Sequence, residues 1–255
     1  MADDVTVDIH GLVADIVIHR GPANFFDAKT LGRVADIGEH VASAGNARAI
    51  VLSSAGKHFC AGADFGAGPL EGDRDRAAAE IYEQGARLFE LELPIVAAVQ
   101  GAAIGGGLGL ACAADFRVAS TATRFVANFT ALGFHHGFGL SVTLPRIIGA
   151  QPALDMLLTA RRVGGTEALR LGLADRLAEP GGEHDAAVAL ATEIAERAPL
   201  AVHAIRRTLR SELAVQVRAA LQHELDEQRR LWRTVDSRIG IAASLARETP
   251  EFTGR

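Results

Sequence analysis

The chain has 255 residues, of which 49% are apolar and 22% charged, and its formal net charge is -5 at pH 7. A chain of this kind can bury a sizeable core as one large domain or as a domain with an extension. The acidic balance and the lack of a basic run argue against a nucleic-acid partner. No uncharged apolar stretch reaches the roughly 18 residues that a membrane span needs, and the first residues do not form a leader. We therefore expect a cytoplasmic protein without a membrane partner.

The N-terminal part of the sequence predicts strands and one helix. Apolar residues alternate over residues 5–9 and again over residues 13–18, with a glycine between the two runs, which predicts a β-hairpin. Asp27 is a candidate N-cap for a helix that ends at Gly45. A strand over residues 49–53 follows.

Further along the chain, strand and helix patterns alternate as far as Ala119, which indicates an α/β fold with repeated turns. After residue 180 the strand signal ends and the remaining pattern is helical. The sequence thus predicts a core over residues 1–180 and a helical region over residues 181–255. The predicted helices after the first one span residues 73–91, 105–113, 139–147, 152–159, 186–197, 200–231 and 235–246.

Two glycine-containing loops each follow a strand-like apolar run. Residues 57–64 read KHFCAGAD, and residues 101–108 read GAAIGGGL. Where Gly105 to Gly107 open a helix, their unpaired N–H groups face outward at the positive end of the helix dipole. Two such loops can together hold one carbonyl oxygen in an oxyanion hole built from the backbone. The alternative is that these glycines serve only tight turns and helix–sheet packing.

Other glycine and cysteine motifs do not fit the sequence. Lys57 lacks the Ser or Thr and the upstream glycine spacing of a phosphate-binding loop, and the second glycine loop does not give the dinucleotide fingerprint. No G-x-S-x-G elbow occurs. Cys60 and Cys112 form neither a disulfide framework nor a zinc motif, so we expect no metal.

Several segments together resemble the signature regions of the crotonase superfamily, the enoyl-CoA hydratase/isomerase fold. The resemblance spans nearly the whole chain, and its segments are residues 53–65, 94–101, 114–119, 144–149 and 168–175. It implies an α/β crotonase (ClpP-like) spiral of repeated ββα units with an α-helical C-terminal region. It also implies an acyl-CoA substrate, no cofactor beyond the coenzyme A of that substrate, and a homotrimer or a dimer of trimers. The C-terminal helices would make the trimer contacts; alternatively, they only cap their own domain.

The resemblance also assigns roles to individual residues. The backbone N–H groups of Ala63 and Gly106 would be the oxyanion donors, aimed at the thioester carbonyl oxygen. The carbonyl of Ala61 would receive the adenine amino group of coenzyme A. The remaining coenzyme A contacts would come from Lys57, Asp64, Gly105 and Arg247. Lys57 and Arg247 match cationic positions near the phosphates, and Arg247 would reach in from a neighbouring subunit. The alternatives are that Lys57 is a solvated loop lysine and that Arg247 is a surface charge on the last helix. Gly66 stands where the family can carry a phosphate-binding lysine.

The carboxylates that hydration requires are missing. Adding water across a double bond needs one group that activates the water and one that handles the proton at Cα, and family hydratases use two glutamates for this. Their positions correspond here to Gly109 and Phe129, and a third recurrent acid position corresponds to Gly137. No Asp or Glu occurs between Ala119 and Ala153. The sequence therefore predicts a family member that lacks both hydratase glutamates.

His135 and His136 are the candidates for a replacement base, because a histidine can accept and return a proton near neutral pH. Alternatively, one of them is exposed and the other bonds a backbone carbonyl in a tight turn. Asn128 and Ser141 are weaker polar candidates. Structural or surface roles are predicted for Tyr82, His19, His58, His203 and His223.

The sequence thus favours an acyl-CoA-processing enzyme that stabilises a thioester enolate and catalyses isomerisation, C–C cleavage or thioester hydrolysis. A catalytically inactive acyl-CoA-binding protein and an ordinary enoyl-CoA hydratase are the alternatives.

Overall fold

The computed structural model describes residues 4–64 and 71–255, with side chains described from residue 74 onward in the second range. Its larger sheet has the strand order β1-β2-β3-β4-β6-β9, in which β1 and β2 form an antiparallel hairpin and the other neighbours are parallel. The predicted hairpin is confirmed. The strands of this sheet are β1 (Val5–His10), β2 (Val13–Ile18), β3 (Ala49–Ser54), β4 (Ile95–Ala98), β6 (Phe116–Ser120) and β9 (Arg176–Ala178).

A second, smaller sheet has the strand order β5-β7-β8. Its strands are β5 (Ala102–Ile104), β7 (Arg124–Val126) and β8 (Arg162–Gly164), and each has only three residues. Strands this short carry too little alternation to be predicted from sequence. They matter because β5 follows β4 closely in the chain and lies within the second glycine loop.

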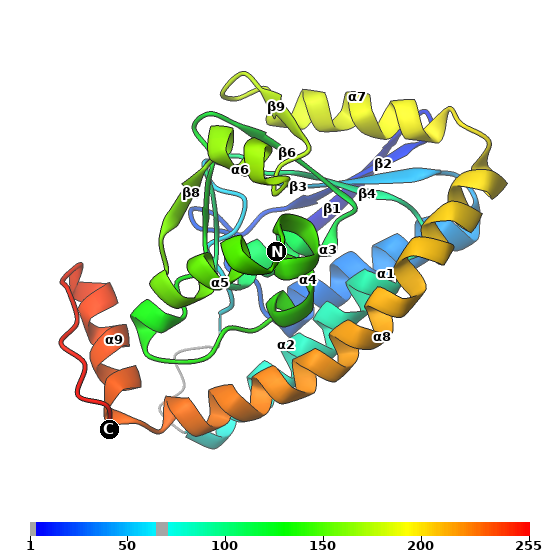
Figure 1. The fold of residues 1–255 in the computed structure, drawn as a ribbon. Helices are drawn as coiled ribbons and strands as arrows, with labels where there is room; N and C mark the ends of the chain where they lie inside the picture. Colours follow the sequence, from blue (N-terminus) through cyan, green and yellow to red (C-terminus); the bar gives the residue numbers. More distant parts are fainter. Residues whose placement is uncertain (1–3, 65–70) are drawn as a thin grey trace.

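Helix α1 (Ala28–Ala44) has the ends that the sequence predicts. The Asp27 side chain accepts a hydrogen bond from the Thr30 N–H, and Gly45 closes the helix with φ 67°. Helix α2 (Glu71–Glu90) packs beside α1 on the inner face of the larger sheet, as Figure 1 shows. Alternate residues of β3 supply this inner face, where Ile50 and Leu52 join the main core.

The other face of the larger sheet is covered by α7 (Glu183–Ala195). Val51 and Val96 pack there against Ala187, Leu190 and Ala191. The strands between are buried on both faces, as parallel strands covered by helices on both sides are. The first helix of the predicted C-terminal region therefore packs directly on the N-terminal sheet.

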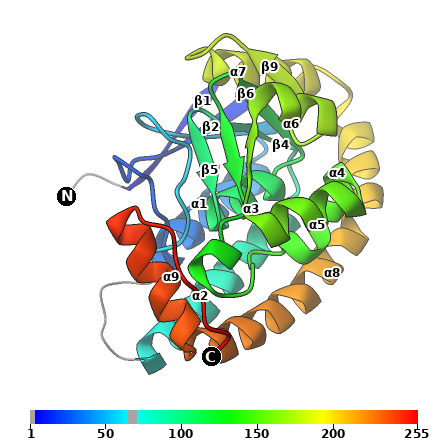
Figure 2. The same cartoon turned by 60° about the vertical axis from the view of Figure 1, so that its left-hand side comes forward.

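The remaining helices surround the smaller sheet and the second glycine loop (Figure 2). They are α3 (Gly106–Ala113), the 3-10 helix η1 (Thr130–Leu132), α4 (Leu140–Ile148), α5 (Ala150–Thr159) and α6 (Gly165–Leu171). Helix α8 (Pro199–Trp232) has 34 residues and packs along α2 and α4. Helix α9 (Val235–Ala246) then packs against η1. Among the described helices, none has the long apolar stretch that a membrane span requires.

Candidate functional site

Two short β-bridges bring the glycine loops together. Cys60 and Ala103 pair in parallel, with the Cys60 N–H bonded to the Ala102 carbonyl at 3.1 Å. Further along the same loop, Ala63 pairs in parallel with Phe26. The Phe26 N–H donates to the Gly62 carbonyl at 3.1 Å, and the Asp64 N–H donates to the Phe26 carbonyl at 2.6 Å. The loop of residues 57–64 is therefore held between two backbone segments.

This bridging pattern leaves two N–H groups free at the same point. Because Phe26 bonds to the residues on either side of Ala63, the Ala63 N–H points away from Phe26. Gly106 is the first residue of α3, so its N–H has no acceptor within the helix. A Cβ added to Gly106 would lie 3.4 Å from the Ala63 nitrogen. Within the described part of the chain neither group donates a hydrogen bond.

These N–H groups face a cavity of about 430 Å³ that Ala63 and Gly106 both help to line. Its walls come from both glycine loops, α2, the segment around η1, and the ends of α8 and α9. The aromatic lining residues are Phe25, Phe26, Tyr82, Phe129, Phe134 and Phe138. Among the described lining residues there is no carboxylate and no imidazole; Arg74, Tyr82, Asn128, Gln228 and Ser244 are the polar side chains.

Neighbouring side chains fill the space at two of the three empty acid positions. A Cβ at Gly109 would meet Phe138 Cβ at 2.5 Å, and a Cβ at Gly137 would meet the Tyr82 hydroxyl at 1.7 Å. Both distances are far below van der Waals contact, so no larger residue fits without rearrangement. Phe129, at the third position, is itself part of the cavity wall and 7% exposed.

His135 and His136 stack on each other with ring centroids 4.1 Å apart. His135 Nδ1 donates to the His136 carbonyl at 2.7 Å, and His136 Nε2 lies 2.8 Å from Ser141 Oγ. Burial, together with the charges of His135 and His223, lowers the pKa of His136 to about 3. Neither imidazole is among the residues that line the cavity. Their role as base stays a prediction, and the local bonds match the alternative of a carbonyl-bonded turn.

The carboxylate beside this pair belongs to Glu224 on α8, and it is completely buried. It accepts hydrogen bonds from the Gly139 N–H at 2.8 Å and from the Ser141 N–H at 2.9 Å. These are unpaired donors at the start of α4, so Glu224 caps that helix from a distant element. Burial raises the pKa of Glu224, and the bonds from Ser141 and Gly139 oppose the rise.

Comparison with known proteins matches residues 8–255 to the family model described as enoyl-CoA hydratase/isomerase. The chain belongs to this family. It is 36% identical over 214 residues to a probable enoyl-CoA hydratase of Rhodobacter capsulatus, covering 83% of each chain. It is 32% identical to the carnitinyl-CoA dehydratase of Proteus mirabilis over the full length of both. A solved enoyl-CoA hydratase/isomerase from Pseudoalteromonas atlantica superposes with a TM-score of 0.86 at 26% identity, covering 98% of this chain and 100% of that one. The crotonase fold that the sequence predicts is confirmed.

The candidate coenzyme A contacts of this enoyl-CoA hydratase/isomerase family member lie in different surroundings. Ala61 and Gly105 line the cavity beside the two free N–H groups. Asp64 is exposed and forms an ion pair with Arg20 at 3.5 Å. Lys57 is exposed, and Arg247 is exposed at the C-terminal end of α9 with φ 60°. Gly66 lies outside the described residues.

The polar pair of Tyr82 and Gln228 is the part of the site that the sequence did not reveal. Tyr82 Oη donates to Gln228 Oε1 at 2.8 Å across 146 positions of sequence. The prediction of a structural or surface role for Tyr82 missed that this residue lines the cavity. No local sequence signal links these two residues, because they meet only where α2 packs on α8.

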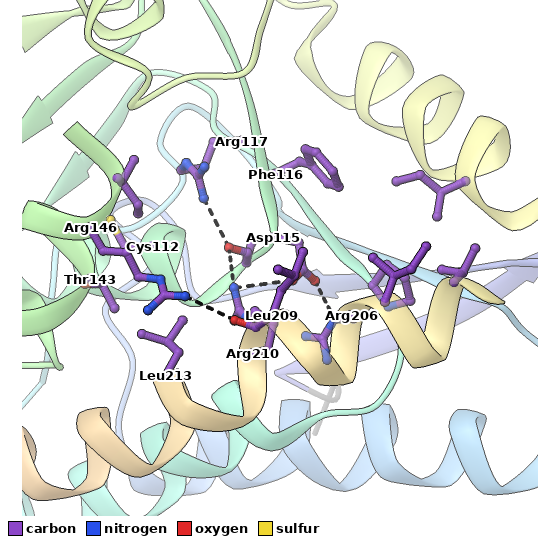
Figure 3. A pocket seen from close by; sticks show the side chains of 16 residues that line it. Cys112, Asp115, Phe116, Arg117, Thr143, Arg146, Arg206, Leu209, Arg210 and Leu213 are labelled. Carbon is purple, nitrogen blue, oxygen red and sulfur yellow. Dashed lines mark hydrogen bonds and ion pairs between the residues drawn. The ribbon is translucent and has the colours of Figure 1, made fainter. Parts of the chain in front are cut away.

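A second cavity, of about 520 Å³, is lined by side chains of α4, the first half of α8 and the end of α3 (Figure 3). In this family member, the arginines that line the second cavity form ion pairs with Asp115 or donate hydrogen bonds to backbone carbonyls. Arg206 and Arg210 pair with Asp115 at 2.9 Å and 3.3 Å. Arg210 and Arg117 also donate to carbonyls at the C-terminal end of α3, and Arg146 donates to the Leu209 carbonyl. The bonds from Arg210 and Arg117 cap the C-terminal end of α3. Neither glycine loop is among the residues that line this cavity.

Proposed function

We propose that this chain is an acyl-CoA-processing enzyme that holds the thioester carbonyl oxygen between the N–H groups of Ala63 and Gly106. The observation that carries the proposal is the meeting of two unpaired backbone donors at the wall of an apolar cavity. The arrangement supports enolate chemistry because each donor is strengthened by the low local dielectric and costs no reorganisation. One such donor is typically worth about 3 kcal/mol in the transition state.

The reaction is proposed to be enolate-based chemistry other than fast hydration. Relatives of this chain are named hydratases or dehydratases. Here, however, the described lining of the cavity contains no carboxylate. Isomerisation, C–C cleavage and thioester hydrolysis use the same stabilised oxyanion and do not share the requirement for two glutamates. His135 or His136 could act as base only by moving toward the cavity or through an intervening group.

A second candidate function is acyl-CoA binding without catalysis. It is favoured by the same lining, because the described cavity offers hydrogen-bond donors but no group of ordinary basicity. Both candidates require the thioester oxygen to sit between Ala63 and Gly106, and they differ only in proton transfer at Cα.

Exchange of the Cα hydrogens of butyryl-CoA with deuterated water, followed by mass spectrometry, tests the proposal. The native protein should accelerate exchange above the buffer rate. In Gly106→Pro, which removes one N–H, exchange should fall about a hundredfold. Gly106→Ala is the matched control, because it adds a Cβ against Phe26 as proline does but keeps the N–H. Equal losses in the two variants would contradict the oxyanion role.

Binding of butyryl-CoA without exchange would support the binding protein instead of the enzyme. A native protein that does not bind acyl-CoA in calorimetric titration would contradict both.

A further inference from the structure

The Tyr82–Gln228 pair is fixed by bonds at both ends. Tyr82 Oη donates to Gln228 Oε1 at 2.8 Å, and Gln228 Nε2 donates to the His135 carbonyl at 2.9 Å. The second bond orients the amide, so that its oxygen faces Tyr82 and its nitrogen keeps one further N–H to donate. Gln228 is 1% exposed and Tyr82 is 7% exposed, so both groups work in a largely water-free setting.

Both polar atoms converge on Gly137. A Cβ at this glycine would lie 1.7 Å from Tyr82 Oη and 2.7 Å from Gln228 Nε2. All three residues line the same cavity as Ala63 and Gly106. Because Gly137 has no side chain, the Tyr82 hydroxyl and the Gln228 amide can lie side by side at the cavity wall.

Every described polar side chain that lines the cavity can donate a hydrogen bond. The donors are the two backbone N–H groups, the Tyr82 hydroxyl, the Gln228 amide nitrogen and the Arg74 guanidinium, and the neutral side chains of Asn128 and Ser244 complete the polar lining. The guanidinium lies over the Trp232 ring at 4.5 Å, which holds a positive charge at this wall. No described lining residue is anionic. Such a lining complements a ligand that carries two acceptor oxygens and a delocalised negative charge.

We infer that the cavity selects 3-oxoacyl thioesters and binds their enolate form, with the C3 oxygen at the Tyr82–Gln228 pair. This inference rests on the proposed function, which places the C1 oxygen between Ala63 and Gly106. On binding, the C2–H bond breaks, its proton passes to the buffer, and its electron pair becomes the enolate charge shared by the two oxygens. No further reactant is needed, because the 3-oxo group makes C2 acidic by itself.

Tyr82 acts in this arrangement as a neutral donor. Burial, together with the negative charge of Glu224, raises the pKa of Tyr82 well above its ordinary value. Tyr82 therefore keeps its proton at neutral pH and acts as a donor, not as the base. To bond the C3 oxygen, the hydroxyl turns from Gln228 Oε1 toward the ligand, or Gln228 donates its second amide hydrogen.

Calorimetric titration with acetoacetyl-CoA and butyryl-CoA tests the inference, because the two ligands differ only in the C3 oxygen. The native protein should bind acetoacetyl-CoA at least tenfold more tightly, and the enolate absorbance should persist to lower pH in the bound ligand than in the free one. Tyr82→Phe should lower the affinity ratio about tenfold, as loss of one buried hydrogen bond does. A merely structural role would weaken both ligands together and keep the ratio.

Two further variants keep the test decisive. Tyr82→Phe combined with Gln228→Leu removes both members of the pair, so neither is left facing a lost partner in the other, although the His135 carbonyl loses its donor. The double variant should still show the lowered ratio. Thr143→Val removes a buried hydroxyl outside this cavity, on α4, and should leave the ratio at the native value.

A native protein that binds both ligands equally would overturn the inference and leave the proposed function standing. A native protein that binds neither would overturn the proposed function.

Discussion

At the scale of single residues, aromatic side chains fill the space that glycines leave open around the cavity. Phe138 occupies the space beside Gly109, and the Tyr82 hydroxyl occupies the space beside Gly137. A carboxylate restored at either position would have to displace a packed ring. At these two positions the acid is absent and packed side chains fill the space that it would need. Changing one residue back to a glutamate would therefore not restore an acid at either position.

The first prediction at this scale concerns hydration. With Gly109 and Phe129 at the glutamate positions, we expect crotonyl-CoA hydration to be several orders of magnitude slower than in an efficient hydratase. Each acid/base group typically contributes about 10²- to 10⁴-fold, and two such groups are not simply additive. The loss of crotonyl-CoA absorbance measures the rate. Fast hydration that survives His135→Ala and His136→Ala would refute this and point to an acid from elsewhere, such as residues 73–83.

The second prediction concerns the pH dependence of stability through His136. Its pKa falls from 6.5 to about 3 in the folded chain, so the folded chain binds this proton less tightly than the unfolded chain. The stabilising contribution is complete above pH 6.5 and is lost as the pH falls toward 3. At about 1.4 kcal/mol per pKa unit, the loss is of the order of a few kcal/mol.

Urea unfolding of the native protein and of His136→Asn, at a series of pH values below 6.5, measures this contribution. Other titrating groups act in both proteins, so the difference between the two curves isolates His136. Parallel curves would show that the imidazole does not change its protonation on unfolding.

At the scale of elements, α8 organises the site through side chains that reach back to earlier parts of the chain. Glu224 caps α4, and four positions later Gln228 bonds both Tyr82 and the His135 carbonyl. One face of α8 thus fixes the start of α4, the histidine turn and the polar wall of the cavity. Residues four apart share a helix face, which explains how one element serves all three.

The third prediction follows from the cap. Glu224→Ala removes the acceptor of two buried N–H groups at the start of α4, and we expect it to cost roughly 2–4 kcal/mol. Glu227→Ala is the matched control on the same helix, because Glu227 pairs with Arg230 at the surface and its loss should change stability little. Chemical denaturation of both variants compares them. Equal effects would show that the cap contributes nothing beyond surface electrostatics.

At the scale of the whole molecule, several helices expose large apolar side chains. On α8, Leu200 is 84% exposed, and Ile205 and Leu209 are each 62% exposed. Leu158 on α5 is 63% exposed and Leu245 on α9 is 82% exposed. Large apolar side chains that are this exposed are typical of surfaces that other chains cover.

The fourth prediction is that the chain assembles as a trimer or a dimer of trimers through its C-terminal helices. Light scattering at micromolar concentration should give the mass of a trimer or hexamer. Leu209→Asp should lower this mass, because it places a charge in an apolar surface that assembly would bury. A native monomer would reject the prediction, together with a contact from Arg247 of one chain to coenzyme A on another.

The sequence by itself determined the elements that rest on local patterns. The hairpin, the capped α1, the helix after the second glycine loop and the three C-terminal helices follow from apolar periodicity and end signals. It also determined the two glycine loops and the missing acids, because these are statements about which residues are present.

Only the tertiary structure decided which polar side chains face the cavity. Tyr82 and Gln228 meet where α2 packs on α8, while His135 and His136 lie adjacent in sequence and outside the lining. The direction of a side chain depends on the summed packing of distant elements, and no local propensity encodes that sum. The backbone part of this site was therefore predictable from sequence, and its side-chain part was not.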